Sequence, residues 1–190
     1  MLALHERKLL EWFQCAMSEL SEILENVSPV EEHHLGEFIR PARRIFMNGQ
    51  GRSGLVVRMA AMRLMQLGRE AYVLGDATTP AIQSGDLLIA VSGSGETEGV
   101  VRVARRAKAL GAQVAVVSAM MQSSLADCAD HLTVIPGRSP KISFDSDSQL
   151  PLASTLEQAM LLFFDCMVAW LAAQEGQDNT SMMARHANLE

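Results

Sequence analysis

The chemistry of this 190-residue chain is concentrated in a loop rich in serine and glycine, residues 92–97 with the sequence SGSGET. Ser92, Ser94 and Thr97 supply three hydroxyl groups, and the glycines between them let a ligand oxygen approach the backbone. Unpaired N–H groups and the positive dipole end favour an anion at the start of a helix. The loop therefore predicts a phosphate-binding site. The structural alternative is a serine-rich turn with an ordinary helix cap.

The elements on either side of the loop favour the phosphate site. Residues 86–91 consist of Asp86 and an apolar run that is typical of a strand inside a parallel sheet. Apolar residues then recur at helical spacing from Val100 to Leu110, which places Thr97 in the first turn of a helix. Open parallel sheets bind ligands beyond the carboxyl ends of their strands, and the loop lies at such an end.

A second glycine-rich loop, residues 49–54 with the sequence GQGRSG, follows an apolar strand at 45–47 and precedes a helix. This pattern matches the G-x-G-x-x-G fingerprint of dinucleotide-binding proteins, and Asp76 follows at about the interval of a ribose-binding acid. The chain is too short to add a catalytic domain for a hydride acceptor, and a dinucleotide fold does not explain the loop 92–97. We therefore keep the dinucleotide site as an alternative.

The rest of the chain alternates strands and helices. After two amphipathic helices within residues 1–40, strands are expected at 45–47, 71–74, 86–91, 113–118 and 131–135, with helical segments between them. This repetition predicts the α/β class, a three-layer α/β/α sandwich of Rossmann-like type around a five-stranded parallel sheet. We expect one domain over 1–190, with its sheet core at 44–136 and a last helix and tail at 151–190.

The last helix is predicted from Pro151 to Gln174, after a loop at 137–149 that is expected to be mobile. Its apolar residues cover more than one face, so we expect it to be buried on two sides, one of them against another subunit. Glu157 lies in its first turns as the lone carboxylate among mostly apolar neighbours.

Composition excludes several classes of partner. The formal charge of −6 and a pI near 5.4 argue against nucleic acid and membrane surfaces. No apolar run is expected to reach the length of a membrane span, so the chain is predicted to be cytoplasmic. Three separated cysteines indicate neither a disulfide framework nor a zinc site, and the adjacent His33 and His34 point in different directions. We expect no metal.

Four segments in this order resemble the sugar isomerase (SIS) domain and, within it, the 6-phospho-3-hexuloisomerase family: residues 49–54, 92–97, 151–158 (PLASTLEQ) and 185–190 (RHANLE). The resemblance covers nearly the whole chain. It implies a homotetramer without a cofactor that interconverts D-arabino-3-hexulose 6-phosphate and D-fructose 6-phosphate. That reaction belongs to formaldehyde assimilation by the ribulose monophosphate pathway.

The resemblance also implies roles for individual residues. The phosphate of the sugar would be held by four hydroxyl groups, those of Ser53, Ser92, Ser94 and Thr97. Gly51, Gly93 and Arg52 would border the substrate, and Arg52 would polarise its oxygens, pair with the phosphate or form a structural salt bridge. His186 matches the family's tail histidine and would relay protons between sugar oxygens, its alternative being a solvated histidine in a frayed terminus.

Moving a carbonyl group between C3 and C2 requires removal of a carbon-bound proton, a cis-enediol intermediate and protonation of the neighbouring carbon. One carboxylate can carry out both transfers. Glu157 is the candidate because apolar surroundings raise the pKa of a carboxyl group toward the range in which it accepts and returns a proton. An ordinary solvated helix glutamate is the alternative.

Two other functions remain open at this point. A non-catalytic phosphosugar sensor would need the phosphate site but no base, and it would normally carry an output domain for which this chain has no room. An isomerase of the same superfamily acting on another sugar phosphate would share all of the predicted site.

Overall fold

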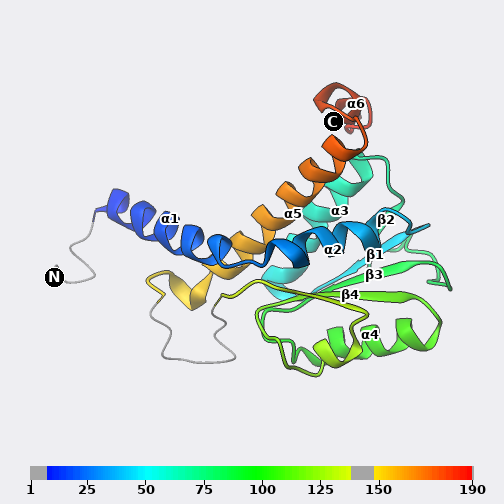
Figure 1. Cartoon of the computed structure of the whole chain (residues 1–190), viewed down its shortest axis with the longest axis horizontal. Coiled ribbons are helices and arrows are strands. Elements are labelled where there is room, and N and C mark those ends of the chain that lie inside the picture. Colours follow the sequence, from blue (N-terminus) through cyan, green and yellow to red (C-terminus); the bar gives the residue numbers. More distant parts are fainter. Residues whose placement is uncertain (1–7, 138–147, 190) are drawn as a thin grey trace.

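The computed structural model describes residues 8–137 and 148–189 (Figure 1). Most of the loop predicted at 137–149 lies outside the described residues. Five strands form one sheet in the order β2-β1-β3-β4-β5, and every pair is parallel. The strands are β1 (Ile45–Asn48), β2 (Ala71–Val73), β3 (Leu87–Val91), β4 (Gln113–Ser118) and β5 (His131–Val134). The predicted five-stranded parallel sheet is therefore confirmed.

Helices cover both faces of the sheet because successive side chains of each strand point to opposite faces. One face packs against α1 (Leu9–Glu25), α2 (Pro29–Ile39), α3 (Gly51–Gln66) and α5 (Thr155–Gln174). The other face packs mainly against α4 (Glu98–Ala109) and the short 3₁₀ turn η2 (Ala126–Cys128). These two apolar clusters make the three layers that Figure 1 shows.

The strand order places a topological switch point between β1 and β3. The chain leaves β1 through α3 and reaches β2 on one side, and it leaves β3 through α4 and reaches β4 on the other. The two connections diverge, so the carboxyl ends of β1 and β3 border a crevice, where open α/β sheets bind their ligands. Both glycine-rich loops of the sequence start at this crevice.

The last helix differs from its prediction at its start. The 3₁₀ turn η3 (Pro151–Ala153) comes first, Leu152 adopts a φ of 55°, and α5 begins only at Thr155. A leucine in the left-handed region cannot continue a regular helix, so the chain changes direction there. The break sets the direction in which the first turn of α5, with Glu157, approaches the sheet.

The wide apolar surface of α5 is mostly covered within the chain. It packs between α1 and α3, and half of its residues are buried. By length and composition α5 meets the criterion for a membrane span, contrary to the sequence expectation, but half of that apolar window lies inside the fold, as in the core helix of a soluble protein. The expected subunit contact therefore finds little support in α5.

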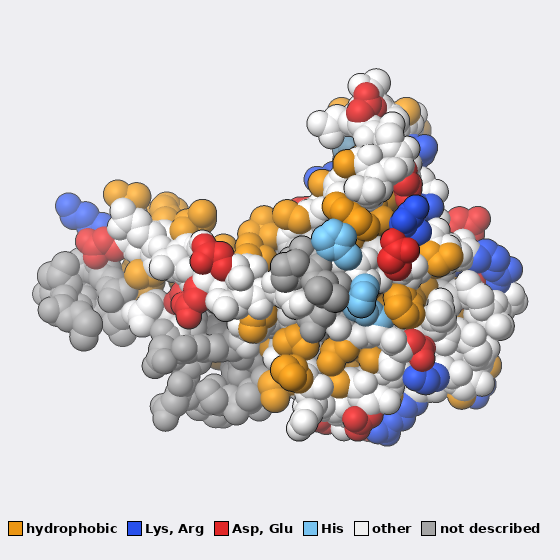
Figure 2. Space-filling view, in the orientation of Figure 1, with side chains coloured by type: hydrophobic (Ala, Val, Ile, Leu, Met, Phe, Trp, Pro, Cys, Tyr) orange, Lys and Arg blue, Asp and Glu red, His pale blue; other side chains and the backbone are white. Residues whose placement is uncertain are grey.

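Exposed apolar side chains instead lie on α1, which projects from the body of the molecule in Figures 1 and 2, and on α3. The α1 residues are between 57 and 67% exposed: Leu9, Leu10, Phe13 and Met17. The α3 residues are between 38 and 61% exposed: Leu55, Met59, Met62 and Met65. We call these sets the α1 and α3 apolar stripes.

A buried ionic cluster lies at the amino ends of the parallel strands, which we call the amino edge of the sheet. The carboxylate of Asp86, before β3, is fully buried and accepts hydrogen bonds from Arg44 at 2.6 and 3.1 Å, from Arg43 at 3.2 and 3.3 Å and from the backbone N–H of Gln83 at 2.7 Å. Burial alone would raise the pKa of Asp86, but these hydrogen bonds outweigh it and lower the pKa below its usual value.

Candidate active site

The hydroxyl groups of the loop 92–97 gather at the carboxyl end of β3, as predicted. Ser92 and Ser94 are buried, and the hydroxyl oxygens of Ser92 and Thr97 lie 3.0 Å apart. The Ser94 hydroxyl accepts a hydrogen bond from the backbone N–H of Glu96 at 3.3 Å. Thr97 is the N-cap residue of α4, but its side chain makes no capping bond, so its hydroxyl is not committed to the helix backbone. The arrangement is suited to an anion at the start of α4.

Backbone hydrogen bonds to the end of β4 and the residues after it hold this loop in shape. The N–H of Ser92 donates to Val117, the N–H of Ala119 donates to Gly93, and the N–H of Leu125 donates to Gly95, at 3.0–3.1 Å. Gly95 has a φ of 67°, and a Cβ atom there would collide with the side chain of Ser123. The loop is therefore preorganised and requires glycine at this point.

Glu96 stabilises the outer side of the loop 92–97. Its carboxylate accepts a hydrogen bond from the backbone N–H of Ser124 at 2.7 Å, and this bond, with a second from the Ser124 side chain, lowers the pKa of Glu96. Because the side chain is exposed, we assign Glu96 to holding the loop rather than to the chemistry.

The loop 49–54, which follows β1, faces the loop 92–97 across the crevice. Ser53 is buried in the first turn of α3, and Gly51 has a φ of 59°. A Cβ atom on Gly49 would strike the backbone of Ser53. The side chain of Gln50 reaches across to α4, where its amide lies against Gly99 so closely that a larger residue at 99 would displace it. The two loops thus contact each other at the switch point.

Arg52 joins the start of α3 to the start of α5. Its Nε donates to the Glu157 carboxylate at 3.1 Å, and one terminal nitrogen lies 3.5 Å from the carbonyl oxygen of Ser154. The Glu157 side chain is 19% exposed and that of Arg52 55%. Of the roles considered for Arg52, the free protein shows the salt bridge. Glu157 is partly buried as predicted, but its partner is a guanidinium rather than apolar groups alone.

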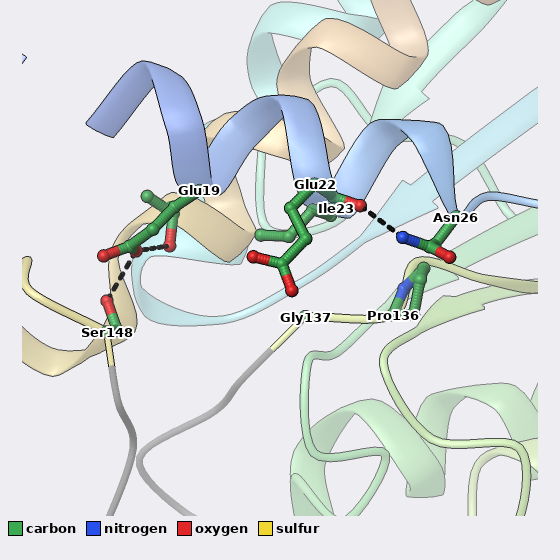
Figure 3. Close-up of a pocket in the computed structure, with 8 residues that line it drawn as sticks. Glu19, Glu22, Ile23, Asn26, Pro136, Gly137 and Ser148 are labelled. Atoms are coloured by element: carbon green, nitrogen blue, oxygen red, sulfur yellow. Dashed lines mark hydrogen bonds between the residues drawn. The ribbon is translucent and has the colours of Figure 1, made fainter. Parts of the chain in front are cut away.

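Glu19 of α1 fixes the segment that leads into α5. Its carboxylate accepts hydrogen bonds from the hydroxyls of Ser148 and Thr155 at 2.8 and 3.0 Å (Figure 3). It also accepts one from the backbone N–H of Gln149 at 2.6 Å. Glu19, Ser148 and Thr155 also border a cavity of about 510 Å³, which lies between α1 and the segments at 136–137 and 148–155. None of the predicted site residues lines this cavity, so we assign Glu19 to positioning the first turn of α5.

His186 lies far from the site in its own chain. It is exposed, and it follows the short helix α6 (Asn179–Met183), which comes after the end of α5 opposite to Glu157. Seventeen residues of helix separate Glu157 from Gln174, a span of about 25 Å at 1.5 Å per residue. Arg185 hydrogen-bonds the carbonyl oxygen of Gln66 at the far end of α3, which fixes the tail there. The chain therefore does not bring its own His186 to its own Glu157.

Two other sequence expectations meet the structure here. Asp76, the ribose-binding candidate of the dinucleotide alternative, pairs with Arg58 at 2.9 Å. Among residues 8–137 and 148–189, no group of three or more His, Cys, Asp or Glu side chains is arranged to hold a metal ion. The absence of a metal stays a prediction.

The sheet, its switch point and the two loops define a sugar isomerase type of α/β protein. The family model of the SIS domain matches residues 38–162. The chain is 37% identical over 185 residues to the 3-hexulose-6-phosphate isomerase of Bacillus subtilis, covering 96% of this chain and all of that protein. It is 36% identical over 177 residues to the enzyme of the same name from Methylomonas aminofaciens, covering 93% of this chain and 97% of that one.

A solved structure agrees with these relatives. The crystal structure of a Methanococcus jannaschii protein, reported with an inferred molecular function of 3-hexulose-6-phosphate isomerase, superimposes with a TM-score of 0.82 and 31% identity over 95% of this chain and 99% of that one. The chain belongs to the SIS domain family and, within it, to the family of these 3-hexulose-6-phosphate isomerases.

Sequence reasoning missed two residues of the site. Gln50 stands between two glycines of the loop 49–54, and this position was its only signal in the sequence. Glu19 gave no local signal, because its partners are about 130 residues away in the sequence.

Proposed function

We propose that this chain is a 3-hexulose-6-phosphate isomerase, which interconverts D-arabino-3-hexulose 6-phosphate and D-fructose 6-phosphate. The observation that carries the proposal is the Arg52–Glu157 pair, because it brings a carboxylate to the loop that faces the paired hydroxyls of Ser92 and Thr97. A phosphate group and the carbon atoms of one small sugar can therefore lie in the same crevice.

In the proposed reaction the phosphate is held by the hydroxyls of Ser53, Ser92, Ser94 and Thr97, with the backbone at Gly51 and Gly93 beside it. Glu157 removes the proton from C2 of the 3-hexulose, and the electrons of that C–H bond form the C2=C3 double bond of a cis-enediol. Glu157 then returns a proton to C3, while His186 moves the proton of the C2 hydroxyl to the former carbonyl oxygen at C3, so that the C2 oxygen becomes the carbonyl oxygen of fructose 6-phosphate. The electron pair stays within the substrate and each proton removed is matched by one returned, so no oxidant or cofactor is required, and the protonated Glu157 carboxyl can exchange its proton with solvent in between.

Arg52 takes a second role in this proposal. Its guanidinium is half exposed and bonds Glu157 through one nitrogen, so other donors remain for a substrate oxygen. A positive charge beside the enediol oxygens stabilises the negative charge that develops when the C–H bond breaks. The same contact keeps the Glu157 side chain directed at the crevice.

His186 acts in this proposal in the site of a neighbouring subunit, where it moves protons between the two sugar oxygens. The position of His186 beyond the far end of α5 supports action between subunits rather than within one chain. The exposed α1 and α3 apolar stripes supply surfaces that association would bury. We accordingly propose that the chain forms a homo-oligomer, specifically a homotetramer.

Three further proposals complete the assignment. Residues 1–190 form one domain, the chain works in the cytoplasm, and its reaction serves formaldehyde assimilation through the ribulose monophosphate pathway. The names of the relatives support a metabolic enzyme of sugar phosphates.

A non-catalytic phosphosugar-binding module is the second candidate. A match to an uncharacterised HTH-type regulator of Escherichia coli favours it, but that match, at 32% identity, covers only 56% of this chain and 40% of the regulator.

The two functions separate when a panel of pentose, hexose and heptose phosphates is incubated with the protein and followed by NMR. The proposal predicts conversion of fructose 6-phosphate to a 3-ketohexose phosphate. Binding without conversion of any sugar supports the regulatory module, and conversion of a pentose or heptose phosphate alone supports an isomerase for another sugar.

A further inference from the structure

Asn48, the last residue of β1, has a buried side-chain amide nitrogen, Nδ2, with no hydrogen-bond partner among the described residues. The residue is 8% exposed. A buried amide nitrogen that makes no hydrogen bond lowers stability, and such groups are rare in well-packed proteins. Its place at the switch point between β1 and β3 suggests that the partner comes with the ligand.

The direction of the Asn48 side chain follows from its neighbours. Ile45 and Met47 belong to the apolar cluster under α3 and α5, and Phe46 belongs to the cluster under α4. Strand side chains alternate, so Asn48 points to the α4 side.

The two residues after Asn48 agree with this direction. A Cβ atom on Gly49 would point at the backbone of Ser53 in α3. The side chain of Gln50, in extended backbone, reaches Gly99 in the first turn of α4. Asn48 therefore lies beneath the start of α4.

The same position makes Asn48 a neighbour of the phosphate site. Asn48 pairs with Ala90 of β3, and Ser92 follows two residues later on the same face. Diagonal neighbours of this kind have their Cα or Cβ atoms roughly 7–8 Å apart, a gap that an amide and a hydroxyl directed at each other largely fill. The Ser92 hydroxyl is 3.0 Å from that of Thr97, so an amide directed at Ser92 from β1 approaches a pair of hydroxyls.

We propose that Asn48 is a positioning residue of the phosphate site, whose amide N–H donates to the Ser92–Thr97 hydroxyl pair when phosphate is bound. The inference rests on the proposed function, because it requires a phosphorylated ligand. In the free protein one of the two hydroxyls donates to the other. When both turn to donate to phosphate oxygens, that bond is lost, the hydroxyl that accepted it has both lone pairs free, and the rotated hydroxyls can accept from the amide.

The proposal predicts opposite effects on folding and on binding. Asn48→Leu removes a donor that the free protein leaves unpaired, so thermal stability is retained or increased. Calorimetric titration with inorganic phosphate and with fructose 6-phosphate should show affinity for both lowered by roughly 5- to 10-fold.

Asn48→Asp provides a second test, because the Asp side chain has nearly the same shape as that of Asn. A carboxylate behind the hydroxyls accepts hydrogen bonds from them and repels the bound phosphate. The loss of phosphate affinity in Asn48→Asp should therefore exceed that in Asn48→Leu. The loss should diminish as the pH is lowered and the new carboxyl becomes protonated.

A double-mutant cycle distinguishes positioning from general packing. In the Ser92→Ala background the amide has lost half of its acceptor pair, so Asn48→Leu should lower the remaining phosphate affinity by less than about 2-fold. Equal losses in both backgrounds would show that Asn48 acts independently of the hydroxyl pair.

Unchanged phosphate affinity in both Asn48 variants would overturn the proposal and leave the amide a structural feature. Failure of the unaltered protein to bind either ligand would overturn the proposed function together with it. The two failures are therefore distinguishable from the same titrations.

Discussion

The amino edge of the sheet and its carboxyl edge, where the strands end, both bury polar groups, but these groups differ in how far they are hydrogen-bonded. At the amino edge, the Asp86 carboxylate accepts hydrogen bonds from two arginines and a backbone N–H, so it needs nothing further. At the carboxyl edge, the hydroxyls of Ser92 and Thr97 bond mainly to each other, and the Asn48 amide bonds to nothing among the described residues. Satisfied buried groups support architecture, whereas unsatisfied groups at a crevice indicate a ligand.

The comparison predicts that substitutions at the carboxyl edge change binding or catalysis, whereas substitutions at the amino edge change stability. The largest expected effect is that of Glu157→Gln, because the amide keeps the shape of the carboxylate but cannot take a proton from carbon. Carbon-bound proton exchange into the solvent should fall by about 10²- to 10⁴-fold while fructose 6-phosphate affinity is retained.

The matched control for this variant is Asp165→Asn, because Asp165 is a carboxylate on the same helix that pairs with Arg63 at 3.6 Å. It should leave exchange unchanged. Substantial exchange by Glu157→Gln, after reversion by deamidation has been excluded by mass spectrometry, would remove Glu157 from the mechanism.

Asp86→Asn tests the amino edge. Loss of the buried charge leaves Arg44 without its partner and should lower the free energy of unfolding by about 3 kcal/mol, measured by urea denaturation. Phosphosugar affinity of the folded protein should not change. Asp130→Asn is the control, since the partly exposed Asp130–Lys108 pair should contribute less.

The pH dependence of stability follows from the lowered pKa of Asp86. The carboxylate binds protons less readily in the folded state, so its stabilising contribution is fully present above the pKa of the unfolded chain. It is lost as the pH falls through the lower pKa of the folded state. Asp86→Asn should therefore flatten the acid side of the stability profile, and an unchanged profile would contradict the role given to the cluster.

Ser94→Ala and Thr97→Val test the phosphate site. Each removes a hydroxyl that the proposal places on a charged oxygen, so each should weaken phosphosugar binding by about 1.5–3 kcal/mol without a comparable loss of stability. Ser21→Ala on α1, which also removes a hydroxyl with a local hydrogen bond, serves as the control. If both site variants bind as tightly as the unaltered protein, the phosphate site is wrongly assigned.

Mixing experiments test the contribution of His186 from a second subunit. Inactive Glu157→Gln and His186→Ala proteins, dissociated and reassembled together in equal amounts, should recover activity at about a quarter of the wild-type sites. If every site takes both residues from one chain, mixing restores nothing. A nearly active His186→Ala protein would by itself end the catalytic role of His186.

Much of the fold could be predicted because its signals are local. The apolar runs of β3 and β4 and the glycines that follow β1 and β3 fix strands and loops from a few neighbouring residues. The loop 92–97 could be placed at the end of a strand for the same reason, and the structure gathers its hydroxyls there.

Features that depend on distant contacts could not be predicted. The Arg52–Glu157 pair joins residues 105 positions apart, and the break at Leu152 follows from how the chain enters α5 rather than from its helical pattern. The sequence does not reveal that α1 and α3 pack against α5, so it could not show how much of the apolar surface of α5 remains for another subunit. The unpaired amide of Asn48 is visible only once its surroundings are known.

Deuterium incorporation into fructose 6-phosphate in D₂O tests the central claim most directly. If the chain forms a cis-enediol between C2 and C3, NMR should show deuterium at C3 of the recovered sugar and none at C1. Exchange at C1 would indicate an aldose–ketose isomerase instead, and no exchange at either carbon from a protein that binds the sugar would contradict catalysis altogether.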